Sequence, residues 1–218
     1  MTVERLKDFF IENAGIARPV ANTVTRRLLD ADKLTRGSRG HAAHHLPAEN
    51  YANMALAMMV QGDGFDTVTT RIVKRMEDAG SLVFAQPYAV LRGDNWDTET
   101  PLVQGRAFAD ELAHLLVRAA DPVTRLELDE VIVGVGVGYS GTAVHAWFDL
   151  GPDLEPVGPA ILAKGTDTTS FVSGPTGSRL IASRGEATGL VRETYFRWNF
   201  IKCLAAFGAR DNPKWLSS

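Results

Sequence analysis

Residues 126–150 read LELDEVIVGVGVGYSGTAVHAWFDL. Valine stands at every second position from Val131 to Val137, and the second half of the stretch alternates in a similar way. A period of two is typical of strands, and glycine beside serine is typical of a tight turn. The stretch therefore predicts two antiparallel strands joined near Tyr139–Gly141.

Helical patterns precede this hairpin, and shorter strand-like segments follow it. Apolar residues recur at helical spacing in five segments, which are residues 3–13, 19–33, 47–62, 65–79 and 104–119. Two further strand candidates, 156–165 and 177–185, come before a closing helix expected at about 188–207. We expect an α+β fold with a helical N-terminal half and a small antiparallel sheet closed by a C-terminal helix. We expect two domains. Residues 1–80 form a helical domain, and residues 81–218 form an α+β oligomerisation or effector domain.

The composition is that of an ordinary globular protein. The chain has 218 residues, of which 45% are hydrophobic and 22% charged. Its single cysteine, Cys203, excludes an intrachain disulfide, and its apolar surroundings predict a small buried hydrophobe. No run approaches the ~18 apolar residues of a membrane span, and the N-terminus lacks a signal-peptide pattern. We expect a cytoplasmic protein without membrane contact and without a cofactor.

Charge is unevenly distributed along the chain. Residues 1–45 hold eight lysines and arginines against five acidic residues, whereas the whole chain has a net charge of -3. A basic head on an acidic body is typical of a nucleic-acid-binding module joined to an oligomerisation or effector domain. The charge distribution therefore indicates a binding surface within the first 45 residues.

Residues 16–46 read IARPVANTVTRRLLDADKLTRGSRGHAAHHL. This segment resembles the recognition helix and wing of winged helix-turn-helix DNA-binding domains, and the order of elements is also similar to that of phage and prophage proteins. The resemblance rests on the residues Val20, Thr23, Val24, Arg26, Arg27, Leu28, Leu29, Leu34, Arg36, Arg39 and Gly40. It implies that the second helix enters the major groove and that the glycine turn touches the DNA backbone or minor groove.

The residue types of this segment suit DNA independently of the resemblance. Arginine neutralises phosphates and forms bidentate hydrogen bonds to guanine, while threonine suits a phosphate or a thymine methyl group. Glycines in the turn let the backbone approach the duplex closely. The expected DNA-contacting residues are Asn22, Thr23, Thr25, Arg26, Arg27, Arg36, Arg39 and His41.

Three classes of function fit the sequence. The first is a homo-oligomeric protein that binds duplex DNA, either a transcriptional regulator or a phage DNA-packaging subunit of the small-terminase type. The second is an enzyme or small-ligand protein built on the β-rich half, with Tyr139, Ser140, His145 and Asp149 as candidates. The third is an interaction protein whose basic head binds an acidic protein. A solvated helix surface, or an anion other than DNA, also explains the arginines.

Several patterns resemble known sites and have simpler explanations. The glycines of Gly136–Gly141 match G-x-G-x-x-G, but a second strand follows them instead of a helix, so we interpret them as a twisted strand and turn. His41, His44 and His45 lack accompanying ligands, which favours phosphate contact or exposure over a metal. Neither Ser140 nor Ser170 lies in a G-x-S-x-G elbow that would make it a nucleophile with His145 and Asp149.

The expected closing helix is the most aromatic part of the chain. Five aromatic residues fall between residues 195 and 207, which is more than one buried helix face needs. They indicate either core packing against the sheet or an interface with another chain.

Overall fold

The protein contains a helical layer and an antiparallel sheet. The computed structural model describes residues 2–35, 45–61, 70–84, 89–92, 95–97, 106–140, 143–151, 154–157, 161–164, 167–174, 177–185 and 191–216. The α-helices within these ranges are α1 (Val3–Ala14), α2 (Arg18–Asp30), α3 (Ala48–Val60), α4 (Thr70–Gly80), α5 (Phe108–Ala120), α6 (Pro122–Asp129) and α7 (Trp198–Asp211). A short 3-10 helix, Pro213–Leu216, follows α7.

The strands form two antiparallel sheets. The smaller sheet has the order β2-β1-β5 and consists of β1 (Ala89–Arg92), β2 (Asn95–Asp97) and β5 (Leu154–Val157). The larger sheet has the order β6-β7-β8-β4-β3-β9, and every neighbouring pair in it is antiparallel. Its strands are β3 (Ile132–Ser140), β4 (Ala143–Leu150), β6 (Ile161–Lys164), β7 (Asp167–Gly174), β8 (Gly177–Arg184) and β9 (Arg192–Arg197). The α+β class and the β3–β4 hairpin predicted from the sequence are confirmed.

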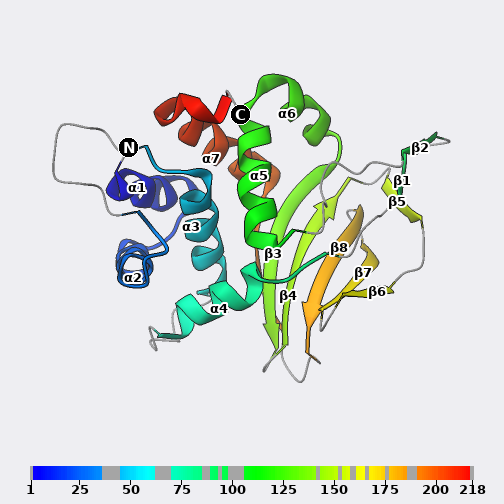
Figure 1. The fold of residues 1–218 in the computed structure, drawn as a ribbon, viewed down its shortest axis with the longest axis horizontal. Coiled ribbons are helices and arrows are strands. Elements are labelled where there is room, and N and C mark those ends of the chain that lie inside the picture. Colours follow the sequence, from blue (N-terminus) through cyan, green and yellow to red (C-terminus); the bar gives the residue numbers. More distant parts are fainter. Residues whose placement is uncertain are drawn as a thin grey trace.

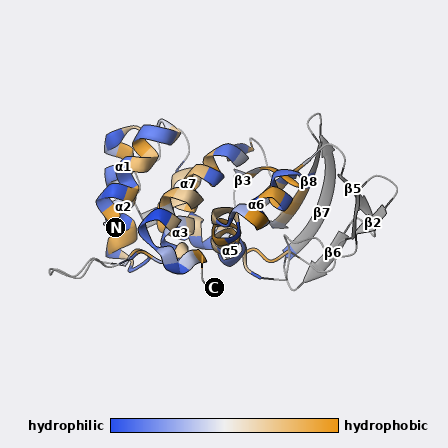
Figure 2. Cartoon of the chain, turned by 90° about the horizontal axis from the view of Figure 1, so that it is seen from above, coloured by the Kyte–Doolittle hydropathy of each residue, from blue (hydrophilic) through white to orange (hydrophobic). Residues whose placement is uncertain are grey.

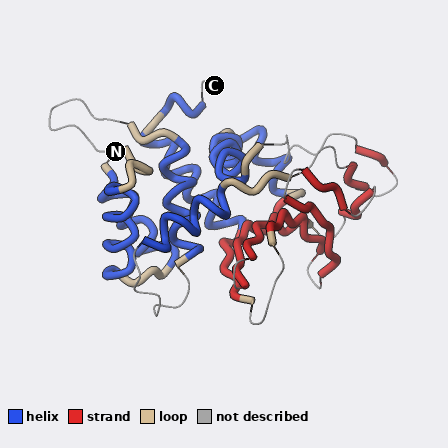
Figure 3. Tube along the Cα trace, turned by 60° about the horizontal axis from the view of Figure 1, so that its bottom comes forward, coloured by secondary structure: helices blue, strands red, loops and turns tan. Residues whose placement is uncertain are grey.

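Helices and strands occupy separate halves of the molecule (Figure 3). The helices α3, α5 and α7 lie between the large sheet and the pair α1–α2, which forms the end of the molecule farthest from the strands (Figure 1). Seen from above, α1 and α2 carry hydrophilic residues on much of their surface (Figure 2). This placement leaves one side of α2 accessible from outside.

Local signals explain why α1 and α2 form two helices joined by a short turn. The Thr2 hydroxyl accepts from the Arg5 backbone N–H, and α1 ends at Gly15, whose φ of 67° is the left-handed conformation that glycine adopts without strain. Three residues later α2 begins, with Pro19 in its first turn. A connection of three residues containing glycine is typical of a helix-turn-helix.

One hydrophobic core joins the two predicted domains. Phe9 and Phe10 of α1 pack against aromatic residues of β9 and α7, with ring centroids 4.5 Å apart for Phe9–Phe207 and 5.5 Å for Phe10–Phe200. The same core cluster includes residues on both sides of residue 80. Most of the late aromatic residues are therefore core residues, and only Tyr195 is strongly exposed, at 47%.

Two segments differ from the secondary structure predicted for them. Residues 122–129 form α6, because the Asp121 carboxylate caps its N-terminus by accepting from the Val123 N–H at 3.1 Å. Residues 192–197 form the edge strand β9, where a helix was expected, because β3 offers a free edge to which they pair in antiparallel register. In residues 192–197, pairing with β3 therefore outweighs the helical preference of the local sequence.

Among the described residues, no helix combines the length and the apolar character that crossing a membrane requires. Cys203, expected to be buried, is exposed instead. The side chains of α7 that enter the core include those of Ile201, Leu204 and Ala205, and the cysteine falls on the outer side of the helix.

Candidate nucleic-acid interface

The outward side of α2 carries three of the residues predicted to contact DNA. Asn22 and Arg26 are exposed and lie one turn apart, while Thr23 beside them is half-buried. The Arg26 side chain is 81% exposed, and Arg18 at the start of the helix is 62% exposed. Arg18, Asn22 and Arg26 follow one another at intervals of four residues, so they form a single stripe along α2.

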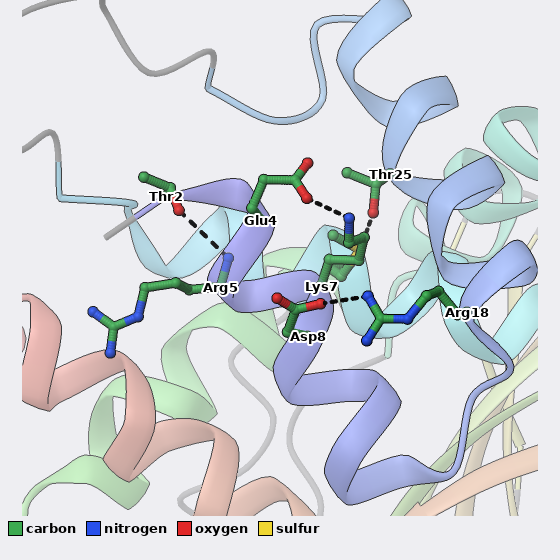
Figure 4. Close-up of polar contacts among 8 residues, drawn as sticks. Thr2, Glu4, Arg5, Lys7, Asp8, Arg18 and Thr25 are labelled. Atoms are coloured by element: carbon green, nitrogen blue, oxygen red, sulfur yellow. Dashed lines mark hydrogen bonds and ion pairs between the residues drawn. The ribbon is translucent and has the colours of Figure 1, made fainter.

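Thr25 does not belong to this stripe. It is only 3% exposed, and its hydroxyl lies 4.0 Å from the Met54 sulfur of α3, a contact drawn in Figure 4. The prediction that Thr25 touches DNA is therefore corrected, because its side chain faces the core. Arg27 is half-buried and lies 100° around the helix from Arg26, so the arginine pair spreads over two sides of α2.

The glycine-rich turn of the winged helix-turn-helix resemblance lies outside the described residues. Arg36, Arg39, His41 and His44 all belong to residues 36–44. The ring of His45, the third histidine of this segment, lies against the backbone carbonyl of Asp211 at the end of α7. The structure therefore describes the helices of this segment but not its glycine-rich turn.

Several cations of α1 and α2 pair with acids, and Figure 4 draws the pairs Lys7–Glu4 and Arg18–Asp8. Arg18 lies 3.2 Å from Asp8, and Arg26 lies 3.8 Å from Asp30. Exposed ion pairs of this kind contribute about 0–1 kcal/mol each, because water screens them and long side chains lose freedom in forming them. A phosphate group can therefore replace either carboxylate at small cost.

A groove of about 450 Å³ separates α1 from α2. Its lining includes Lys7 and Arg26 but also Glu4 and Asp30, so positive and negative side chains alternate around it. Lys7 is already paired with Glu4. The groove is thus not a concentrated anion site. Asn22 and Arg26 of the α2 stripe line it, whereas Arg18 lies outside its lining.

A second basic helix lies next to α2. The helix α4 contacts α2 and carries Arg71, Lys74 and Arg75, of which Arg71 and Lys74 are exposed. Together α2 and α4 hold six arginines and lysines against three acidic residues. Lys33, just after α2, also joins the two segments through an ion pair of 2.7 Å with Glu77. Sequence reasoning predicted the helix of residues 65–79 but missed its basic face, because only its apolar inner face was considered. It also left Arg18 out of the site.

Known proteins offer no relative from which a function could be carried over. No family model, curated protein or solved structure matches this chain. Its function is therefore inferred from the geometry and chemistry of its own residues.

The residues considered for a hydrolase do not assemble into a catalytic triad. His145 and Asp149 lie four residues apart on one strand, which places their Cα atoms roughly 13 Å from each other. His145 lies 3.4 Å from Glu193, and Asp149 accepts a hydrogen bond of 2.7 Å from Arg179. Burial lowers the pKa of His145. Each group is thus engaged with a partner outside the expected triad.

The other enzyme candidates are also part of the framework. The Tyr139 hydroxyl donates to the backbone carbonyl of Arg75, and burial raises the pKa of this phenol. Ser140 is buried at the end of β3, and Ser170 lies in β7. Tyr139 therefore reaches toward α4, away from the His145 side of the sheet.

The glycine pattern of residues 136–141 begins inside a strand, as the sequence predicts. Gly136 and Gly138 belong to β3, and the next described element is β4 instead of a helix. Trp147 lies opposite Gly136, and His145 lies opposite Gly138. Among the residues with defined positions, no group of three or more His, Cys, Asp or Glu side chains is placed to hold a metal ion.

Proposed function

We propose that this protein binds duplex DNA through the outward face of α2, with the neighbouring α4 adding positive charge, and that it acts as a transcriptional regulator. The observation that carries the proposal is the stripe of Arg18, Asn22 and Arg26. All three residues are exposed, and the two arginines are held by weak surface ion pairs with Asp8 and Asp30.

The dimensions of the stripe suit the major groove. Arg26 follows Arg18 by eight positions, or about 12 Å along the axis of α2, and a helix with its side chains is about 10–12 Å in diameter. The major groove of B-DNA is about 12 Å wide and admits one α-helix. Asn22 in the middle of the stripe has the side chain that forms two hydrogen bonds with adenine, while the flanking arginines suit guanine or phosphate.

Supporting charge comes from outside the stripe. Arg27 and the cations of α4 lie beside it and can contact phosphates on the flanks of a groove. The rest of the chain is acidic, which favours orientation of the α2–α4 end toward a polyanion. A phage DNA-packaging subunit would use the same surface, so the two roles differ in assembly. A dimer favours the regulator, and a larger ring favours the packaging subunit.

The test is fluorescence anisotropy with a labelled random-sequence duplex at two salt concentrations. We expect binding at low salt, with an affinity that falls steeply as salt rises because counterions are released. The variant Arg18→Ala/Arg26→Ala/Arg27→Ala should bind more weakly, and the slope of log affinity against log salt should decrease by about one unit for each phosphate that the variant no longer neutralises.

The control is Arg192→Ala, which removes one exposed arginine from the edge strand β9, outside α2 and α4. It should bind DNA like the wild type. Absence of binding at low salt, or equal binding by the triple variant and the wild type, overturns the proposal.

A further inference from the structure

The face of the large sheet turned away from the helical core carries a row of three glycines. Val135 and Val137 of β3 enter the hydrophobic core, so Gly134, Gly136 and Gly138, which alternate with them, lie on the opposite face. Each glycine is flanked by one residue of β9 and one residue of β4 in antiparallel register. The absence of side chains along the row leaves space above β3.

Two of the three glycine positions are filled by rings from β4. A Cβ atom added at Gly136 would lie 2.9 Å from Cη2 of Trp147 and closer still to two other ring atoms. A Cβ atom added at Gly138 would lie 2.5 Å from Cε1 of His145. The two rings stack on each other with centroids 5.5 Å apart. The row is therefore closed along most of its length.

The row is least filled at Gly134, where a Cβ atom would lie 3.0 Å from the backbone oxygen of Phe196, 3.5 Å from Cδ2 of Tyr195 and 3.6 Å from Oδ2 of Asp149. Above this position the structure has a cavity of about 440 Å³, whose lining includes Tyr195, Arg197, Asn199, Asp149 and Arg179. Cavities of 300–1,000 Å³ are the usual size for small-molecule sites.

The two arginines that line the cavity differ in their ion pairs. Arg179 is engaged by two acids, at 2.7 Å from Asp149 and 3.2 Å from Glu193, and its guanidinium lies over the Trp147 ring. Arg197 is exposed, and no ion-pair partner for it is found among the residues whose positions are described. Arg197 is thus the cation of this cavity that is open to an anionic group.

Donor and acceptor groups face one another across Gly134. Arg197 pairs with Gly134 from β9, and Asp149 pairs with it from β4, so their Cα atoms are separated by two strand spacings, or about 10 Å. Asp149 is 9% exposed, its Oδ1 is bonded to Arg179, and its Oδ2 is directed toward the gap at Gly134. A carboxylate oxygen of this kind accepts from an ammonium or hydroxyl group.

We infer that this cavity binds a small carboxylic acid that carries an amino or hydroxyl donor next to an apolar side chain, the chemistry of α-amino and α-hydroxy acids. Arg197 and the Asn199 amide receive the carboxylate. Asp149 Oδ2 accepts from the amino or hydroxyl group. The exposed ring of Tyr195 and the side chain of Val133 contact the apolar part, which suits an aromatic or branched side chain.

The inference is independent of DNA binding, because the cavity is lined by residues of β3, β4, β8, β9 and the start of α7, whereas the proposed DNA surface lies on α2. The experiment is isothermal titration calorimetry with four matched probes: L-phenylalanine, L-phenyllactate, 3-phenylpropionate and 2-phenylethylamine. We expect heat from at least one of the first two. The third lacks the donor and the fourth lacks the carboxylate, so both should bind at least about tenfold more weakly.

Arg197→Ala should weaken binding at least about tenfold. Arg192→Ala is the control, because Arg192 is exposed on the same strand but belongs to the alternate set of positions that faces the other way. Thermal melts monitored by circular dichroism verify that both variants are folded. Tyr195→Phe should keep the affinity, since only the ring is used.

Absence of heat with all four probes, equal affinity for all of them, or unchanged affinity in Arg197→Ala overturns the inference. Arg26→Ala should leave ligand binding intact, so failure here and failure of DNA binding are separate results.

Discussion

The close approach of Trp147 to Gly136 makes a measurable prediction about stability. Trp147 is fully buried, and its ring occupies the space that a side chain at position 136 would need. Gly136→Ala therefore forces the ring or the strand to shift. Overpacking of this kind costs about 1–3 kcal/mol, and losing the packing of a large aromatic residue costs about 3–5 kcal/mol. Reduced entropy of the unfolded chain offsets about 0.4–1 kcal/mol.

We therefore expect Gly136→Ala to lower the free energy of unfolding by about 2–3 kcal/mol. This is a large fraction of the roughly 5–15 kcal/mol that stabilises a typical domain. The assay is urea unfolding followed by circular dichroism. With a slope of about 2–3 kcal/mol per molar urea, the midpoint should fall by about 1 M.

A double-mutant cycle tests whether the ring is the cause. Trp147→Leu removes the atoms that collide with the new methyl group while keeping an apolar side chain on β4. In that background Gly136→Ala should be close to neutral, which gives a coupling of at least about 1.5 kcal/mol between the two positions. Additive effects of the two substitutions would refute the reasoning.

Three further predictions concern other parts of the chain. Asp167→Ala removes the acceptor of two hydrogen bonds from Arg184 and one from the Val83 N–H, so the free energy of unfolding should fall by about 2–4 kcal/mol in the urea assay; an unchanged midpoint contradicts this. Burial lowers the pKa of His145 below its usual value, so the folded protein takes up this proton less readily than the unfolded chain. The contribution of this histidine to the free energy of unfolding should be complete above about pH 6.5 and should be lost as the pH falls through the lowered pKa. His145→Gln should flatten this pH dependence. The exposed Cys203 should react with Ellman's reagent in the native state, and reaction only after denaturation would show that the thiol is covered.

Periodicity was enough to predict most of the helices and the central hairpin. The apolar spacing in residues 3–13 and the valine alternation before Tyr139 each reflect a local rule, in which one face of an element is buried. Such patterns predict the observed elements because the core covers the same face along the whole element. They explain why α1 and the β3–β4 hairpin were found from sequence alone.

Features that depend on residues far apart in the sequence could not be predicted from local patterns. The segment 192–197 becomes a strand only because β3 presents an edge, and Thr25 is buried only because Met54 of α3 lies beside it. The open position at Gly134 is likewise defined by residues from β4 and β9. Six strands can be ordered in many ways, and no local pattern specifies which neighbours meet.

The aromatic contact between the two ends of the fold has a consequence for synthesis. Phe9 and Phe10 are covered by Phe196, Phe200 and Phe207, which the ribosome adds almost two hundred residues later. At roughly 5–20 residues per second, the nascent α1 displays these two rings to the cell for on the order of 10–40 seconds. During that interval the growing polypeptide offers a hydrophobic target to chaperones, and the first helices reach their mature environment only after α7 has emerged from the exit tunnel.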